Sequence, residues 1–126
     1  MIGYVTIGAK DSEASGKFYD AFFGAIGSER KFADGGWIGY GEKGQEAHSV
    51  YVCPPHDKQP ATFGNGSMLA FKAASKADVQ AAYEAGLKNG GSDEGAPGPR
   101  PADSTSFYGA YLRDPTGNKI CVFCKP

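Results

Sequence analysis

The sequence predicts an α+β fold made of two similar units packed around a shared cleft, and three observations support this class. A segment that starts at Tyr4 repeats in pattern about 64 residues later, from Met68. Each copy begins with a short apolar strand that leads into a capped amphipathic helix, and strand-like runs follow each helix. Because 126 residues fit one domain, we expect the two units to share one core.

The first unit covers about residues 1–53 and is predicted to start with a strand near Tyr4. A helix should begin at Asp11, whose carboxylate can accept a free backbone N–H at the helix start. Its apolar face consists of aromatic and small residues at helical spacing, namely Ala14, Phe18, Ala21, Phe22 and Ala25. Two strands are predicted at residues 36–41 and 47–53, and residues 29–33 leave room for a further short strand.

The second unit covers about residues 67–126 and follows the same plan. After a strand that begins at Met68, Ser75 and Asp78 have the spacing of a capping box, which predicts a helix start. The run Asn89-Gly90-Gly91 should end that helix. Strands are predicted at residues 107–113 and 119–123, with a further short strand possible near Ser92.

Two segments do not repeat. Residues 54–67 are expected to link the two units. Residues 89–106 have no apolar period and contain three prolines, so they are predicted to form a long loop that borders the cleft. Gly95 and Gly98 would act as its hinges, and the loop is expected to become ordered when a ligand binds.

The composition excludes several classes of function. The 13 basic residues are scattered and are balanced by 14 acidic ones, so no nucleic-acid partner is expected. No run approaches the ~20 apolar residues that span a bilayer, and the N-terminus lacks the charged region of a signal peptide. We therefore expect a cytoplasmic protein with no membrane partner. Three cysteines are too few and odd in number for a disulfide framework.

Three stretches, "GNGSMLAF", "GGSDEGAPGPRP" and "FYGAYLRDPTGN", resemble sequences of the vicinal oxygen chelate superfamily. This superfamily includes glyoxalase I, bleomycin resistance proteins and extradiol dioxygenases, and the chain is most similar to a bacterial glyoxalase-like subgroup. The resemblance covers nearly the whole chain. It implies two paired βαβββ modules whose curved mixed sheets enclose a ligand cleft, and it implies a homodimer, because small members usually pair.

The resemblance also points to four positions where metal-using members carry His or Glu. They fall on Tyr4, Tyr51, Met68 and Cys121 in this chain, with the register of Tyr51 fixed less firmly than the others. A pair of phenols with a thioether and a thiol does not suit the hard divalent ions that this superfamily uses. We therefore expect no metal and no other cofactor, and we interpret the four residues as the floor of an apolar cleft.

The pair Cys121 and Cys124 invites a metal or redox reading, which the predicted strand argues against. Successive side chains of a strand point to opposite faces, so these two thiols cannot chelate one ion. A redox motif of the thioredoxin type needs its cysteines at a helix start, whereas this pair lies in a strand after a turn.

Three further residues are candidates for the cleft. Trp37 is suited either to stacking on a planar ligand or to an ordinary core position. Tyr108 and Tyr111 lie on opposite faces of their strand, and the family pattern favours Tyr108 as the one that faces the cleft. Arg100, between two prolines, could meet an anionic ligand, but a role in tying the loop to the body is favoured. His48 and His56 are expected at the surface.

Three functions follow from these observations. The leading hypothesis is a metal-free protein that binds a small, planar or aromatic molecule in its cleft. The second is a metal-independent enzyme of the lyase, isomerase or dioxygenase type that uses a tyrosine as acid or base, or Cys121 as nucleophile. The third is a metal-dependent lyase or dioxygenase with displaced ligands.

Overall fold

The computed structural model describes residues 1–126 and contains two helices and eight strands. The first unit consists of β1 (Val5–Gly8), α1 (Ser12–Gly24), β2 (Ser28–Asp34), β3 (Trp37–Glu42) and β4 (Val50–Cys53). The second consists of β5 (Leu69–Lys72), α2 (Lys76–Lys88), β6 (Ser92–Pro99), β7 (Tyr108–Arg113) and β8 (Lys119–Cys124). The predicted α+β class with two βαβββ modules is therefore confirmed.

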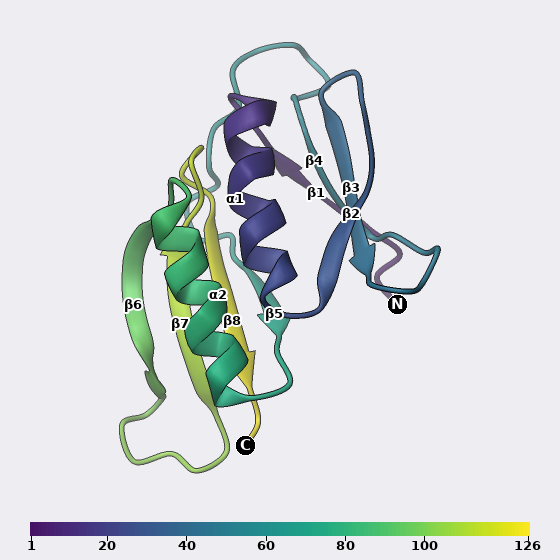
Figure 1. Ribbon diagram of the computed structural model, residues 1–126. Coiled ribbons are helices and arrows are strands. Elements are labelled where there is room, and N and C mark those ends of the chain that lie inside the picture. Colours follow the sequence, from purple (N-terminus) through teal and green to yellow (C-terminus); the bar gives the residue numbers. More distant parts are fainter.

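Each module forms its own four-stranded mixed sheet, and the two sheets have the same order. The first sheet runs β1-β4-β3-β2 and the second β5-β8-β7-β6. The parallel pairs are β1 with β4 in the first sheet and β5 with β8 in the second, and the other neighbouring strands are antiparallel. The two helices lie side by side and cover one face of the sheets (Figure 1). The opposite face of each sheet, turned away from α1 and α2, is called its outer face below.

Both helices start where the sequence predicts. The carboxylate of Asp11 accepts from the backbone N–H groups of Glu13 and Ala14, and the hydroxyl of Ser75 accepts from that of Asp78. Such caps are local features, because the acceptor and the free N–H groups lie within one turn of each other. After α2 the chain reverses at Gly90, whose φ of 98° lies in the left-handed region that glycine adopts without strain.

The core lies between the helices and the sheets and is continuous across the two modules. The rings of Phe22 and Phe23 contact Phe71 of the second module at centroid distances of 6.0 and 5.0 Å. On the same helix, Phe18 packs so close to Gly91 that a Cβ atom there would collide with its ring. Close packing of this kind fixes the position of one module relative to the other.

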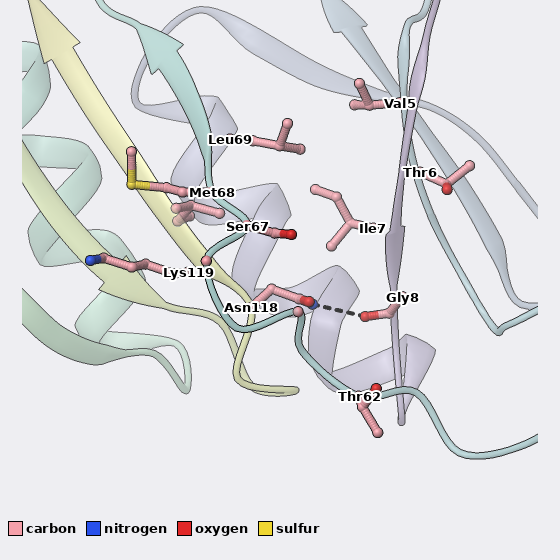
Figure 2. Close-up of a pocket in the computed structure, with 13 residues that line it drawn as sticks. Val5, Thr6, Ile7, Gly8, Thr62, Ser67, Met68, Leu69, Asn118 and Lys119 are labelled. Atoms are coloured by element: carbon pink, nitrogen blue, oxygen red, sulfur yellow. Dashed lines mark hydrogen bonds between the residues drawn. The ribbon is translucent and has the colours of Figure 1, made fainter.

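The turn between β7 and β8 fastens the second module to the first. Asp114 is buried, and its carboxylate accepts from the backbone N–H groups of residues 116, 117 and 118. It also accepts from the Tyr19 hydroxyl of α1 at 2.7 Å. Asn118 of the same turn donates to the backbone oxygen of Gly8 in β1 at 2.9 Å, a bond drawn dashed in Figure 2.

One predicted segment differs from the structure. Residues 92–99, expected to belong to a long loop, form β6 along the edge of the second sheet. Pro97 and Pro99 are compatible with a strand here because an edge strand has one side without a partner that needs N–H donors. Register shifts between Asp93 and Gly95 and between Gly95 and Gly98 accommodate the irregular sequence. Only the short connection from β6 to β7 remains a loop.

No helix in the structure is long and apolar enough to cross a membrane.

Candidate functional site

The outer face of the first sheet carries a cluster of aromatic side chains around Tyr51, in β4. Ring centroids lie 5.5 Å from Tyr51 for Tyr4, 6.0 Å for Trp37, 6.0 Å for Phe32 and 5.4 Å for His48. We call these five residues the aromatic patch. Because Val50 and Val52 face the helices, the alternation of the strand places Tyr51 on the outer face.

The aromatic patch is open to solvent, which is unusual for so many large apolar rings. Tyr4 is 60% and Trp37 41% exposed. The patch also has a polar centre, since the Tyr51 hydroxyl and Nδ1 of His48 are 2.6 Å apart and share a hydrogen bond. An exposed group of rings with one oriented polar group is the surface that a planar molecule with a hydrogen-bonding substituent would fit.

Sequence reasoning identified three members of the patch and missed two. Tyr4, Trp37 and Tyr51 were all expected at the cleft, and the structure brings them together. For Trp37 an ordinary core position was the equal alternative. Phe32 was missed because β2 has a register shift between Arg30 and Phe32, so counting along the strand does not give its face. It lies over Gly39 of β3, where any Cβ atom would collide with its ring. His48 is exposed, as expected, but belongs to the patch.

The outer face of the second sheet is different in character and centres on Tyr111. Arg100 and Lys119 lie over its ring, with Cζ and Nζ at 5.6 and 5.7 Å from the centroid. Across the β7-β8 ladder, Tyr111 pairs with Cys121. The outer face of the second sheet therefore combines a phenol, a thiol and two cations, whereas the outer face of the first sheet is aromatic.

The structure turns Tyr108, the tyrosine expected to face the cleft, toward α2. The Tyr108 hydroxyl accepts a hydrogen bond from Gln80 of α2 at 2.8 Å, and Nζ of Lys76 lies 5.3 Å above its ring. Tyr108 therefore lies on the helix-covered face. The buried residues Ala110 and Leu112 fix this parity, because side chains two positions apart share a face, and the same alternation turns Tyr111 outward.

Cys121 lies on the outer face but is only 1% exposed. Burial raises the pKa of its thiol, and this effect outweighs the opposing influence of Tyr111, Arg100 and Lys119. A raised pKa keeps the thiol protonated at neutral pH, so Cys121 is not an activated nucleophile. Cys124 belongs to the core on the other face, as the predicted alternation requires.

A cavity of about 750 Å³ lies between β1 and the start of β5 and β8. Figure 2 shows Val5, Ile7 and Leu69 around it, and Ser67 and Asn118 contribute polar groups. Of the seven predicted cleft residues, only Met68 lines this cavity. This cavity is thus distinct from the aromatic patch, and its wall includes the strand edges of β1 and β5, which have no partner strand.

The residues at the four positions where the resemblance leads us to expect metal ligands do not suit a divalent ion. Tyr4 and Tyr51 contact each other, Cys121 is buried as a thiol, and Met68 offers only a thioether. No group of three or more His, Cys, Asp or Glu side chains is arranged to hold an ion. The oxygen and imidazole donors that such ions need are therefore not assembled in the chain.

The fold agrees with a match to a known family. Residues 1–122 match the family model of the Glyoxalase/Bleomycin resistance protein/Dioxygenase superfamily, and the chain belongs to this superfamily. The match confirms the resemblance on which the sequence predictions rested.

Solved structures place the chain among its relatives. A glyoxalase/bleomycin resistance protein from Albidiferax ferrireducens T118 is 40% identical, with 98% of each chain covered and a TM-score of 0.86. Two more distant structures share the fold. A glyoxalase/bleomycin resistance protein/dioxygenase family enzyme from Burkholderia phytofirmans PsJN is 18% identical (coverage 99% and 98%, TM-score 0.72). A lactoylglutathione lyase from Agrobacterium tumefaciens is 21% identical (coverage 98% and 92%, TM-score 0.66). No curated protein sequence matches the chain.

Proposed function

We propose that this protein binds a small planar, aromatic molecule on the outer face of its first sheet, without a metal ion. The observation that carries the proposal is the aromatic patch, in which four rings surround Tyr51 at centroid distances of 5.4 to 6.0 Å. Stacked or edge-on aromatic pairs contribute about 0.5 to 1.5 kcal/mol each beyond the area they bury. A ligand in contact with two or three of these rings would gain about 1 to 4.5 kcal/mol from such pairs, which corresponds at most to about millimolar affinity before the buried area is added.

The hydrogen bond between His48 and Tyr51 adds direction to this surface. It occupies one ring nitrogen of His48 and orients the Tyr51 hydroxyl. The second ring nitrogen and the remaining lone pair of the hydroxyl stay available to a polar substituent of the ligand. The proposal is therefore a ligand with a flat apolar body and at least one hydrogen-bonding group.

Trp37 provides a direct readout, because it is the only tryptophan of the chain and lies in the patch. We would titrate the protein with 4-nitrobenzamide, a neutral planar molecule whose nitro group quenches indole fluorescence. Saturable quenching with a Kd below about 1 mM is expected, which corresponds to about 4.1 kcal/mol of binding free energy. Tyr51→Ala should weaken binding by about fivefold or more, because it removes the ring at the centre of the patch.

Phe63→Ala serves as the matched control. Phe63 is also an exposed aromatic side chain, at 51%, but it lies outside the patch, over the guanidinium group of Arg113. Its removal should leave the affinity unchanged. Quenching that rises linearly with concentration and is equal in all three proteins would show collisional contact only, and the proposal would then be abandoned.

The enzyme hypotheses receive less support from the structure. A nucleophilic role for Cys121 conflicts with its burial and raised pKa. A metal-dependent reaction conflicts with the donor set described above. The relative from Albidiferax ferrireducens T118, a glyoxalase/bleomycin resistance protein, is compatible with a binding function.

We also propose that the chain forms a homodimer. Both β1 and β5 are edge strands of their sheets, and unpaired strand edges are commonly covered by another chain or by loops. The exposed hydrophobic side chains near these edges, Ile2 and Met68 among them, favour coverage by a second copy. The two copies would follow the two-fold symmetry of most small homo-oligomers.

A further inference from the structure

Two cations on the outer face of the second sheet have no acidic partner. The chain has three ion pairs, and neither Arg100 nor Lys119 takes part in any of them. Both side chains are half-buried, and both lie within 6 Å of the Tyr111 ring centroid. Partial burial of unpaired like charges on one face is unfavourable unless an anion is present.

The guanidinium group of Arg100 is held in place by the preceding strand, β6. It donates to the backbone oxygens of Ala96 at 2.7 Å and Pro99 at 3.2 Å. A Cβ atom at Gly98 would lie 3.0 Å from Nη1, and one at Gly95 would lie 3.3 Å from Nη2. Glycine at these positions therefore leaves room for the guanidinium group against β6, and the group is pre-organised rather than free in solvent.

This arrangement leaves hydrogen-bond donors unused. A guanidinium group has five N–H donors, and the two bonds above occupy two of them. The ammonium group of Lys119 makes no hydrogen bond within the chain, and its side chain points away from β1 (Figure 2). Free donors from both cations therefore border the Tyr111 ring.

The nearby carboxylates are already engaged, so they do not neutralise this pair. Glu94 binds Arg113 at 3.0 Å, and Asp93 accepts from the Tyr83 hydroxyl and from the backbone N–H of Gly95. In the β7-β8 ladder Lys119 lies directly opposite Arg113, which places two like charges side by side. Glu94 compensates one of these charges and leaves the other.

We propose that the unused donors of Arg100, on the outer face of the second sheet, bind an oxyanion of a small molecule, such as a carboxylate or phosphate group, and that the charge of Lys119 on the same face adds to the attraction. The planar fork of an arginine matches the two oxygens of such a group, and a lysine adds a point charge beside it. This inference goes beyond the proposed function, because it adds a second binding site on the other sheet.

A pair of probes with the same ring tests the charge alone. Isothermal titration calorimetry would compare 4-nitrobenzoate with neutral 4-nitrobenzamide, while NMR follows the Nε–H resonance of Arg100. Charge-assisted hydrogen bonds typically contribute enough for at least about a tenfold gain in affinity. We therefore expect 4-nitrobenzoate to bind at least about tenfold more tightly and to shift the Arg100 resonance, which the amide should not do.

Substitutions locate the effect. Arg100→Gln and Lys119→Gln should each reduce the preference for the anion to less than about threefold. Gly98→Ala should also weaken it, since a methyl group there displaces the guanidinium group without any change in charge. Lys76→Gln is the matched control, because Lys76 lies over the Tyr108 ring on the opposite, helix-covered side, and the preference should remain.

The outcomes separate this inference from the proposed function. Equal affinity for the two probes, with saturable quenching of Trp37 by both, would overturn the anion site and leave the aromatic site standing. A shift of the Arg100 resonance by 4-nitrobenzoate without quenching of Trp37 would support the anion site and argue against the aromatic one. An anion preference that survives Arg100→Gln and Lys119→Gln would also overturn the inference.

Discussion

The hydrogen bond from Tyr19 to Asp114 links α1 of the first module to the β7-β8 turn of the second, and Tyr19→Phe removes this bond alone. The phenyl ring keeps the stacking with Phe23, at a centroid distance of 5.2 Å. Asp114 keeps its three backbone donors and the side chain of Asn118. The substitution therefore tests one contact between the modules without opening a large cavity.

The expected cost follows from burial and charge. Both residues are buried, and the donor and acceptor atoms are 2.7 Å apart. Hydrogen bonds to charged groups contribute about 1.5 to 3 kcal/mol, against about 0.5 to 1.5 kcal/mol for an ordinary one. We expect Tyr19→Phe to lower the free energy of unfolding by about 2 kcal/mol, which corresponds to a fall in Tm of roughly 5 to 10 °C.

Tyr40→Phe is the matched control, because it removes the same hydroxyl group from another buried ring. The Tyr40 hydroxyl donates to Asp20 at 2.8 Å, but the Asp20 side chain is 46% exposed, so water can replace the lost donor. Its cost should stay near or below about 1 kcal/mol. Urea unfolding followed by circular dichroism at pH 7 measures both. A Tyr19→Phe cost equal to or smaller than that of Tyr40→Phe would refute the role assigned to the turn.

Three further predictions concern pH, reactivity and assembly. Burial first, and Asp114 and Asp20 next, raise the pKa values of Tyr19 and Tyr40 above the ordinary 10.0. The folded state then binds more protons than the unfolded state above pH 10. The free energy of unfolding should therefore be highest below pH 10 and fall as the pH rises further. Tyr40→Phe should make this fall less steep, and an unchanged slope would contradict the raised pKa of Tyr40. Iodoacetamide at pH 7.5 should alkylate Cys121 more slowly than a free cysteine, because its buried thiol has a raised pKa, and a faster rate would revive the nucleophile hypothesis. Light scattering at micromolar concentration should give twice the 13.2 kDa of one chain, and the monomer mass would remove the dimer proposal.

Local signals in the sequence were sufficient for the modules. Asp11 and Ser75 mark the helix starts correctly because capping depends on atoms within one turn. The repeat and the apolar periods predicted the order of most strands, because these patterns also depend on residues close together in the sequence. The glycines and prolines of residues 92–99 disfavour an isolated strand and predict a loop, with only a short strand possible near Ser92. Pairing with β7 along an open edge stabilises the full length of β6.

The faces of the strands were harder to predict, and the candidate site depends on them. Alternation predicts that Tyr108 and Tyr111 point in opposite directions, as they do, and the family pattern favoured Tyr108 for the cleft, whereas the structure turns it toward α2. The buried pair Ala110 and Leu112 carried the correct signal in the sequence, because two apolar residues at this spacing mark the core face. No comparable signal exists for Phe32, whose face depends on a register shift in β2.

The neighbourhood of Arg100 illustrates a third kind of limit. The sequence suggested that this residue either binds an anion or ties a loop to the body. In the structure it does hold its own segment, through Ala96 and Pro99, and still keeps donors free. The two readings are therefore compatible, which only the distances could show.

The central claim is that the protein binds an aromatic molecule without a metal ion. It is tested most directly by measuring this binding with protein whose metal content is known. We would measure the Kd for 4-nitrobenzamide through Trp37 fluorescence, before and after treatment with a chelator, with elemental analysis of both samples. The account predicts no stoichiometric Ni, Zn, Fe or Mn, the same Kd in both samples, and a Kd raised about fivefold or more by Tyr51→Ala. One metal ion per chain, with binding that disappears on chelation and returns when the ion is restored, would contradict it.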